Sequence, residues 1–482
     1  MKRLLHQPSN LSNRLVMACW LLLTACATNL MADGGPLNLL VIQTDEHHFG
    51  TLGCYGGKIV GTPHIDRIAA EGAICTSFYA TTPVCSPSRA ALVSGLYPQK
   101  TPVVINDVPM ADNVVTFAEL LRRRGYATGF AGKWHLDGAG KPQWAPKRRF
   151  GFEDNRFMFN RGHWKKFEDG PDGPRVGARN KQGPTYALDG ADETTFSTDW
   201  LCNKAIDFVN EHHERPFCYM LSLPDPHGPN TVRAPYDTMY ADVEVPIPAT
   251  LKRTPQQTPG WGRPANVTAA QLRRLMPPYY GMVKCIDDNV GRILKTLERH
   301  RILDRTIVVF TSDHGDLCGE HGRLNKGVPY EGSARIPFLM RCPPRVPAGT
   351  KIEQALSCVD FLPTVMAMME VDVPHRVDGR DAAAWFAGRS DENWRDMAIL
   401  RSTSGKSPWL AAVSARYKLV LSAADEPWLI DLKNDPSEVV NLAGDPEHAG
   451  TVRTMTEAIA EYARQHQDDH ARHPELRKHL AP

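Results

Sequence analysis

Two continuous apolar runs, each ending in a pair of polar residues, constrain the fold of this chain most strongly. LNLLVIQT (residues 37–44) leads into Asp45-Glu46, and TIVVFTS (residues 306–312) leads into Asp313-His314. Runs rich in Leu, Val and Ile are typical of parallel strands buried on both faces. Acids at the carboxyl end of such strands lie at the sheet edge where open α/β folds bind ligands.

Strand-like and helix-like segments alternate around these runs. YATGFA and FCYMLSL indicate further strands, and helical patterns cover four segments: 63–71, 116–124, 198–213 and 269–300, the last interrupted at Pro277-Pro278. This alternation predicts an α/β fold, a doubly wound sheet with helices on both faces. The polar segment 136–197 has little periodicity and is interpreted as active-site loops, with a solvated insertion as the alternative.

The pattern changes after about residue 380. YKLVLS and PWLIDL are strand-like, and a closing helix is predicted from about residue 451 to 467. We therefore divide the chain into an N-terminal segment 1–32, a catalytic part 33–380 and a C-terminal subdomain 381–482.

The run Cys85-Ser86-Pro87-Ser88-Arg89 places a cysteine at the predicted start of a helix. Pro87 suits the first helical position and Ser86 can cap, so free N–H groups and the positive end of the helix dipole face Cys85. Arg89 lies on the same face and adds a fixed charge. The pattern predicts an anion site, and a buried or merely reactive cysteine is the alternative.

This C-x-P-S-R run resembles the signature of the type I, formylglycine-dependent sulfatases of the alkaline phosphatase superfamily. The resemblance extends from about residue 37 to about residue 442, with four further motifs in the family's order. It implies that a formylglycine-generating maturation enzyme oxidises Cys85. It also implies an alkaline-phosphatase-like large domain with a mostly parallel or mixed sheet, and a small C-terminal α+β subdomain with an antiparallel sheet.

The resemblance further implies one divalent cation, usually calcium. Its ligands would be Asp45, Glu46, Asp313, His314 and an oxygen of the formylglycine at Cys85. Hard cations prefer oxygen ligands, which the three carboxylates supply. The sequence departs from many relatives, which have Asp in place of Glu46 and Asn in place of His314. An imidazole nitrogen is a softer ligand than a carboxylate oxygen. The sequence therefore defines the presence of a cation better than it defines which cation binds.

The resemblance implies catalytic roles for Cys85 and Arg89 and for polar residues of the remaining motifs. In GKWH, Lys133 would bind the sulfate and formylglycine oxygens, and His135 would take a proton from the formylglycine hydrate. In PHGP, His227 would donate a proton to the leaving oxygen or stabilise it. In GEHGRLNKG, Lys326 would be the second sulfate-binding lysine. Lys133, His227 and Lys326 are thus the predicted substrate-binding residues.

The first 32 residues have the composition of an export signal. Basic residues precede the apolar stretch 15–26, which is short for a bilayer span and suits a secretory signal. Leu23-Thr24-Ala25-Cys26 resembles a bacterial lipobox, so lipidation of Cys26 is favoured over simple cleavage near Ala27 or Ala32. An uncleaved membrane anchor is the third reading. Cleavage at Cys26 and cleavage near Ala27 or Ala32 both predict an exported protein, either periplasmic or lipid-anchored at the bacterial envelope.

Composition narrows the functional class. The net charge of +2 over 482 residues argues against a nucleic-acid partner. The eleven cysteines include no CxxC, and buried free thiols are at least as consistent with their contexts as disulfides. Together the motifs predict an exported, calcium-dependent sulfatase that acts on a sulfated carbohydrate. The alternatives are a formylglycine-dependent phosphoester or phosphonate ester hydrolase, and an inactive sulfate-binding protein in which Cys85 is unmodified.

Overall fold

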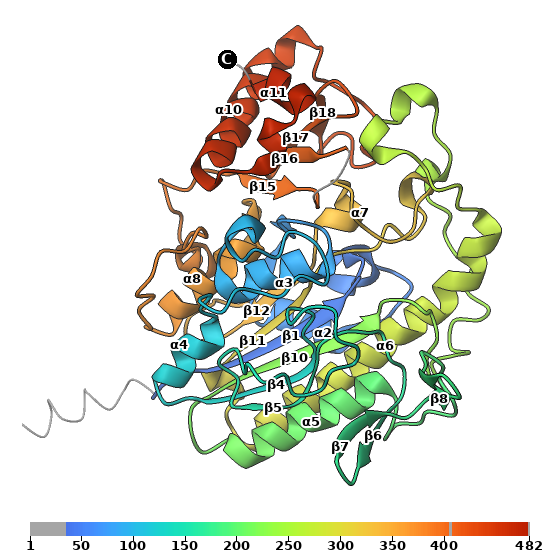
Figure 1. Cartoon of the computed structure of the whole chain (residues 1–482), viewed down its shortest axis with the longest axis vertical. Helices are drawn as coiled ribbons and strands as arrows, with labels where there is room; N and C mark the ends of the chain where they lie inside the picture. Colours follow the sequence, from blue (N-terminus) through green and yellow to red (C-terminus); the bar gives the residue numbers. More distant parts are fainter. Residues whose placement is uncertain (1–34, 404–406, 481–482) are drawn as a thin grey trace, which may run out of the picture. The chain divides into compact units, whose positions relative to one another are not determined.

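The computed structural model describes residues 35–403 and 407–480, and an eight-stranded sheet lies at its centre (Figure 1). From edge to edge the strands are β13 (Thr350–Ile352), β2 (Ala73–Cys75), β12 (Phe338–Arg341), β11 (Thr306–Ser312), β1 (Asn38–Asp45), β10 (Phe217–Pro226), β4 (Ala127–Lys133) and β5 (Asp154–Phe159). Only β12 runs antiparallel to its neighbours in this sheet. The predicted, mostly parallel sheet is confirmed.

Helices cover both faces of the sheet, as the alternating sequence pattern predicts (Figure 1). Ala127 and Ala131 of β4 belong to one apolar cluster with α2 (Pro63–Ala70), α5 (Ser197–His212) and α6 (Ala269–Arg299). Phe130, between those alanines, points to the opposite face because side chains alternate along a strand. There it meets Phe152, which packs on Phe117 of α4 (Phe117–Arg123). Helices α3 (Cys85–Ser94) and α8 (Cys358–Met368) complete that layer.

Helix α6 corrects one prediction, because it runs unbroken through Pro277-Pro278. A proline inside a helix loses a hydrogen bond and costs about 3 kcal/mol. Here Met276, Tyr279 and Tyr280 around the prolines are buried in the core. Burying such side chains stabilises the helix by about 1.5–3 kcal/mol each, which together is of the same size as the penalty for two prolines and offsets it.

The start of α3 corrects a second prediction. The helix begins at Cys85 itself, so Pro87 is its third residue rather than its first. Ser86 does not cap the helix, because its hydroxyl donates to the carbonyl of His135 at 2.8 Å. The N–H of Ser86 instead donates to the Asn106 side chain at 2.9 Å. A residue from another loop thus supplies the acceptor that the helix terminus requires.

Segment 136–197 contains two small antiparallel hairpins in addition to β5. They are β6 (Phe167–Gly170) with β7 (Gly173–Val176), and β8 (Arg179–Asn180) with β9 (Gly183–Pro184). The nine cysteines of the described residues are all unpaired. The predicted export signal, including Cys26, lies outside the described residues. None of the helices within 35–403 and 407–480 is both long enough and apolar enough to cross a membrane.

The C-terminal part forms a second, antiparallel sheet, as predicted (Figure 1). Its strands are β15 (Ala398–Arg401), β16 (Trp409–Val413), β17 (Tyr417–Ser422) and β18 (Trp428–Asp431), in that order. Helices α10 (Ala449–His466) and α11 (Pro474–Leu480) close the chain. The described residues from Asn38 onward form one compact unit. The predicted boundary at residues 380–381 falls between α8 and α9 (Ala383–Phe386) and stays a prediction.

A buried lysine joins the second sheet to the loop that follows Lys326. The ammonium of Lys418 on β17 donates to the carbonyl of Pro329 at 2.7 Å and pairs with Glu331 at 2.6 Å and Glu438 at 2.9 Å. Burial, reinforced by the nearby Glu331, raises the pKa of Glu438 to about 7 against the attraction of Lys418. Two buried acids thus share one buried base, so Glu438 gains a proton near neutrality.

Replacing Glu438 by glutamine should flatten the dependence of folding stability on pH. In the native chain the folded state holds the proton more tightly than the unfolded state, so stability is lost as pH rises from about 4.5 to about 7. The loss should reach at most about 3 kcal/mol. Urea unfolding at pH 5 and pH 8 would measure it, with the exposed Glu457→Gln as the matched control. An unchanged pH slope in Glu438→Gln would refute the assignment.

Candidate active site

Cys85 lies at the N-terminus of α3 and is only 2% exposed. Its Sγ is 3.2 Å from His314 Nε2, 3.7 Å from Lys133 Nζ and 3.9 Å from Asp45 Oδ1. Burial raises the pKa of the thiol, but the charges of Lys133, Lys326 and His314 bring it well below its usual value. The position therefore favours a negatively charged group, as the sequence motif predicts.

Four of the five predicted metal ligands lie together at the carboxyl edge of the sheet. Asp45, Cys85, Asp313 and His314 each offer one ligand atom, and these atoms all lie within 4.8 Å of one another. All four residues are buried. Two carboxylates, an imidazole and the group at position 85 are a donor set that fits a divalent cation.

The fifth predicted ligand, Glu46, lies in a different group. Its carboxylate is 2.8 Å from His227 Nε2 and 3.1 Å from Lys326 Nζ. Burial opposes ionisation, but His227 and Lys326 lower the pKa of Glu46 to about 2. Glu46 has a positive φ of 60°, and its backbone N–H donates to Asp313 at 3.2 Å. This hydrogen bond connects Glu46 to the ligand group, and its predicted role as a metal ligand stays a prediction.

Arg89 is buried beneath the ligand group and joins its two acids. Its guanidinium contacts Asp45 at 3.1 Å and Asp313 at 2.8 Å. The other donors bond the side chains of Gln43 and Ser222 and the carbonyl of Lys133. A guanidinium with so many fixed partners sets the positions of both carboxylates and is not free to rotate toward a ligand.

Lys133 and His135 leave the end of β4 in different directions. Lys133 Nζ lies 2.5 Å from Asp45 Oδ2 and therefore reaches the ligand group. The imidazole of His135 is buried and its Nε2 lies 3.0 Å from Asp107 Oδ1. The recorded contact between His135 and the start of α3 is made by the His135 carbonyl, which accepts a hydrogen bond from the Ser86 hydroxyl. Its predicted proton transfer at position 85 stays a prediction.

His227 and Lys326, both predicted to bind substrate, lie in contact with each other. Lys326 Nζ is 2.7 Å from His227 Nε2, and both contact Glu46. Burial lowers the pKa of Lys326, but the negative charges of Cys85 and Glu46 raise it above its usual value. Four cationic or imidazole side chains therefore surround the space beside Cys85: Lys133, His227, His314 and Lys326.

The comparisons with known proteins agree with this geometry. The family model described as sulfatase matches residues 37–371, and the model for the C-terminal part of N-sulphoglucosamine sulphohydrolase matches residues 319–465. The chain belongs to the sulfatase family. It is a sulfuric ester hydrolase with the alkaline-phosphatase-like fold.

Among its relatives, the sulfatase is 29% identical over 443 residues to the uncharacterized sulfatase YidJ of Escherichia coli (strain K12), covering 88% of this chain and 86% of that one. It is 27% identical over 544 residues to the N-acetylglucosamine-6-O-sulfatase of Bacteroides thetaiotaomicron, covering 96% and 92%. The solved phosphonate monoester hydrolase of Agrobacterium radiobacter shares the fold, with a TM-score of 0.70, 24% identity and coverage of 89% and 96%.

The structure adds site residues that the sequence motifs of this sulfatase do not single out. His163 stacks on His227 with ring centroids 3.5 Å apart, and its Nε2 lies 2.8 Å from Lys133 Nζ. Lys165 pairs with Asp225 at 2.5 Å and donates to the His227 carbonyl, which fixes the His227 loop. Both residues come from segment 136–197, so the interpretation of that segment as active-site loops applies to the part around them. Their location in this segment is the only signal for them in the sequence.

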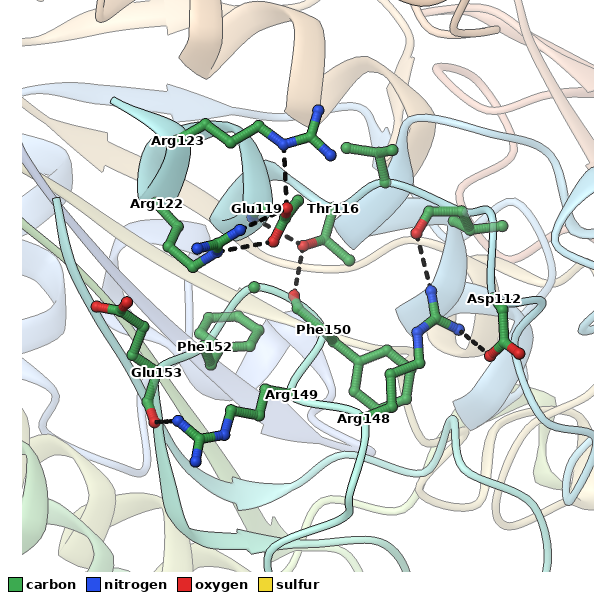
Figure 2. Close-up of a pocket in the computed structure, with 13 residues that line it drawn as sticks. Asp112, Thr116, Glu119, Arg122, Arg123, Arg148, Arg149, Phe150, Phe152 and Glu153 are labelled. Carbon is green, nitrogen blue, oxygen red and sulfur yellow. Dashed lines mark hydrogen bonds and ion pairs between the residues drawn. The ribbon is translucent and has the colours of Figure 1, made fainter. Parts of the chain in front are cut away.

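A separate cavity of about 390 Å³, whose lining Figure 2 shows, lies near the starts of β4 and β5. Gly151 borders the cavity and accepts a hydrogen bond from Thr128 near the start of β4. Lys133, which belongs to the active site, lies at the other end of β4. Its arginines are engaged within the protein. Arg122 and Arg123 pair with Glu119, and Arg148 donates to three backbone carbonyls. This cavity is therefore not part of the active site.

Proposed function

We propose that the sulfatase hydrolyses a sulfate ester of a carbohydrate, using a formylglycine formed from Cys85 and a bound divalent cation, calcium. The observation that carries the proposal is the position of Cys85. It is buried at a helix N-terminus between cationic side chains and two carboxylates. Such a position suits both a cation and the tetrahedral anion of a sulfate group.

The cationic side chains bind and orient the sulfate in this proposal. Lys133 and Lys326 offset the charge of the sulfate oxygens, which would otherwise repel a nucleophile. Arg89 holds Asp45 and Asp313 in place for the cation, together with His314. The cation, when bound, supplies further positive charge next to the sulfate.

Two histidines move protons in the proposed reaction. A formylglycine hydrate at position 85 would offer one hydroxyl for attack on sulfur and a second hydroxyl whose proton must be removed for sulfate to leave. His135 accepts that proton, since Asp107 holds its Nε2 and its Nδ1 has no hydrogen-bond partner among the described residues. His227, between Glu46 and Lys326, donates a proton to the leaving alcohol oxygen or stabilises it.

A carbohydrate substrate is supported by the relatives. Their names include N-acetylglucosamine-6-O-sulfatase, ulvan-active sulfatase and N-acetylgalactosamine-6-O-sulfatase. One solved neighbour is described in complex with its substrate, D-glucosamine-2-N,6-O-disulfate. The location proposed for the protein is the periplasm or the bacterial envelope, on the basis of residues 1–32 alone.

Paired kinetics with one alcohol separate the proposal from its first alternative. A sulfate and a phosphate ester of the same alcohol share their leaving group, so the ratio of kcat/KM compares how well the enzyme transfers each of the two groups. We expect the larger kcat/KM for the sulfate ester. The phosphonate hydrolase fold neighbours and a multifunctional alkaline phosphatase superfamily relative motivate the comparison. A higher value for phosphate would replace the proposal with a phosphoesterase, and no turnover of either would favour a binding protein.

A further inference from the structure

Lys141, Trp164 and Tyr186, all from segment 136–197, form a small group that the proposed function does not use. We call it the Lys141 group. We propose that Lys141, held by Trp164 and Tyr186, binds a second anionic group, a sulfate or a carboxylate, on the saccharide whose sulfate ester is cleaved. This inference rests on the proposed function.

A continuous series of contacts connects the Lys141 group with the sulfate-binding residues. Lys133 Nζ, which lies 3.7 Å from Cys85 Sγ, is 2.8 Å from His163 Nε2. The His163 ring lies 6.0 Å from the Tyr186 ring, and its side chain is 20% exposed. Lys141 Nζ lies 4.7 Å from the centre of the Tyr186 ring. These contacts lead from the buried position 85 outward to the exposed Lys141. A substrate bound at position 85 would extend from the site in the same direction.

The aromatic rings fix the ammonium of Lys141. Nζ lies 5.5 Å from the Trp164 ring, which packs on Tyr186 with ring centroids 4.6 Å apart. Trp164 is buried, and its indole N–H donates to the carbonyl of Arg161 at 3.1 Å. Contacts between a cation and ring faces are worth about 0.5–1 kcal/mol at exposed sites. The ammonium therefore loses less freedom when it binds an anion than a free surface lysine does.

A second lysine in the same part of the chain shows what Lys141 lacks. Lys204 also lies over two rings, those of Phe157 and Trp200, at 4.8 and 4.7 Å. Its ammonium, however, pairs with Asp169 at 2.8 Å. Among the described residues, Lys141 has the ring contacts but no recorded ion pair with a carboxylate. The ammonium is thus held in position with its charge open to an anion from outside the chain.

The test measures binding to protein in which Cys85→Ala removes the nucleophile, in the presence of calcium. Isothermal calorimetry would compare N-acetylglucosamine 6-O-sulfate with glucosamine 2-N,6-O-disulfate. A second pair would compare N-acetylgalactosamine 6-O-sulfate with the same sugar joined to a uronic acid. We expect about two- to fivefold tighter binding of the doubly anionic member of at least one pair. The pair that responds distinguishes a sulfate from a carboxylate.

Adding Lys141→Met to Cys85→Ala should abolish that preference, whereas adding Lys204→Met should leave it unchanged. Lys141→Met in the otherwise native enzyme should also turn over a small aryl sulfate at the rate of the unaltered enzyme, because that substrate does not reach Lys141. Equal binding of both members of both pairs, or a preference that survives Lys141→Met, would overturn the inference. Absence of turnover of both the aryl sulfate and the sulfated sugars by the native enzyme would instead contradict the proposed function.

Discussion

Replacing Cys85 by alanine is expected to abolish turnover of sulfate esters, with kcat lowered at least about ten-thousandfold, as when a covalent nucleophile is removed. The thermal midpoint should change little by comparison, since a small side chain is lost. Cys218→Ala is the matched control. Cys218 is also buried, but it lies near the start of β10, whereas the active site lies at the carboxyl ends of the strands. Comparable turnover in Cys85→Ala and the native enzyme would show that position 85 is not the nucleophile.

Mass spectrometry of the native enzyme tests the maturation of Cys85 directly. The tryptic peptide 68–89 contains both Cys75 and Cys85. Cys75 is fully buried at the sheet and serves as an internal control. We expect an aldehyde or its hydrate at residue 85 and a free thiol at residue 75. Full activity with a thiol at both positions would contradict the proposed chemistry.

Asp313→Ala is expected to lower kcat at least about a hundredfold and to remove the thermal stabilisation that calcium gives the native enzyme. The variant loses one carboxylate of the ligand group and one partner of Arg89. A metal that binds only the folded state stabilises it by mass action, so loss of binding removes that contribution. The rate loss has the size found for one electrostatic stabiliser of a transition state.

The control for Asp313→Ala is Asp372→Ala, which removes an exposed acid. Asp313→Asn keeps an oxygen ligand and should retain more metal than Asp313→Ala while still losing rate. Thermal melts with calcium and with chelator, together with metal analysis, would measure these differences. Unchanged metal content and turnover in Asp313→Ala would show that Asp45, Asp313 and His314 are a polar cluster without a cation.

The sheet and its catalytic edge could be predicted because their signals are local. Apolar runs of seven or eight residues specify buried parallel strands, and the position of Asp45 and Asp313 follows directly from where those runs end. Helix termini were less predictable. The start of α3 depends on Asn106, twenty residues away in the sequence, and the continuity of α6 depends on core packing around its prolines.

The partners of individual side chains could not be predicted, because they depend on the paths of loops. Glu46 follows Asp45 directly, yet a positive φ and the cations of two distant loops place its carboxylate with His227 and Lys326. His163 has no motif around it, and it reaches Lys133 only because the chain returns to the site after β5.

The sequence by itself therefore determined the family signature, the doubly wound sheet and the residues gathered at its carboxyl edge, since periodicity and motif order are properties of neighbouring residues. The tertiary structure decided which charges meet. It assigned Arg89 to the two aspartates, placed the Glu46 carboxylate beside His227 and Lys326, and left Lys141 without a recorded carboxylate partner among the described residues. Electrostatic interactions act through space at distances of a few ångströms, and only the folded chain sets those distances.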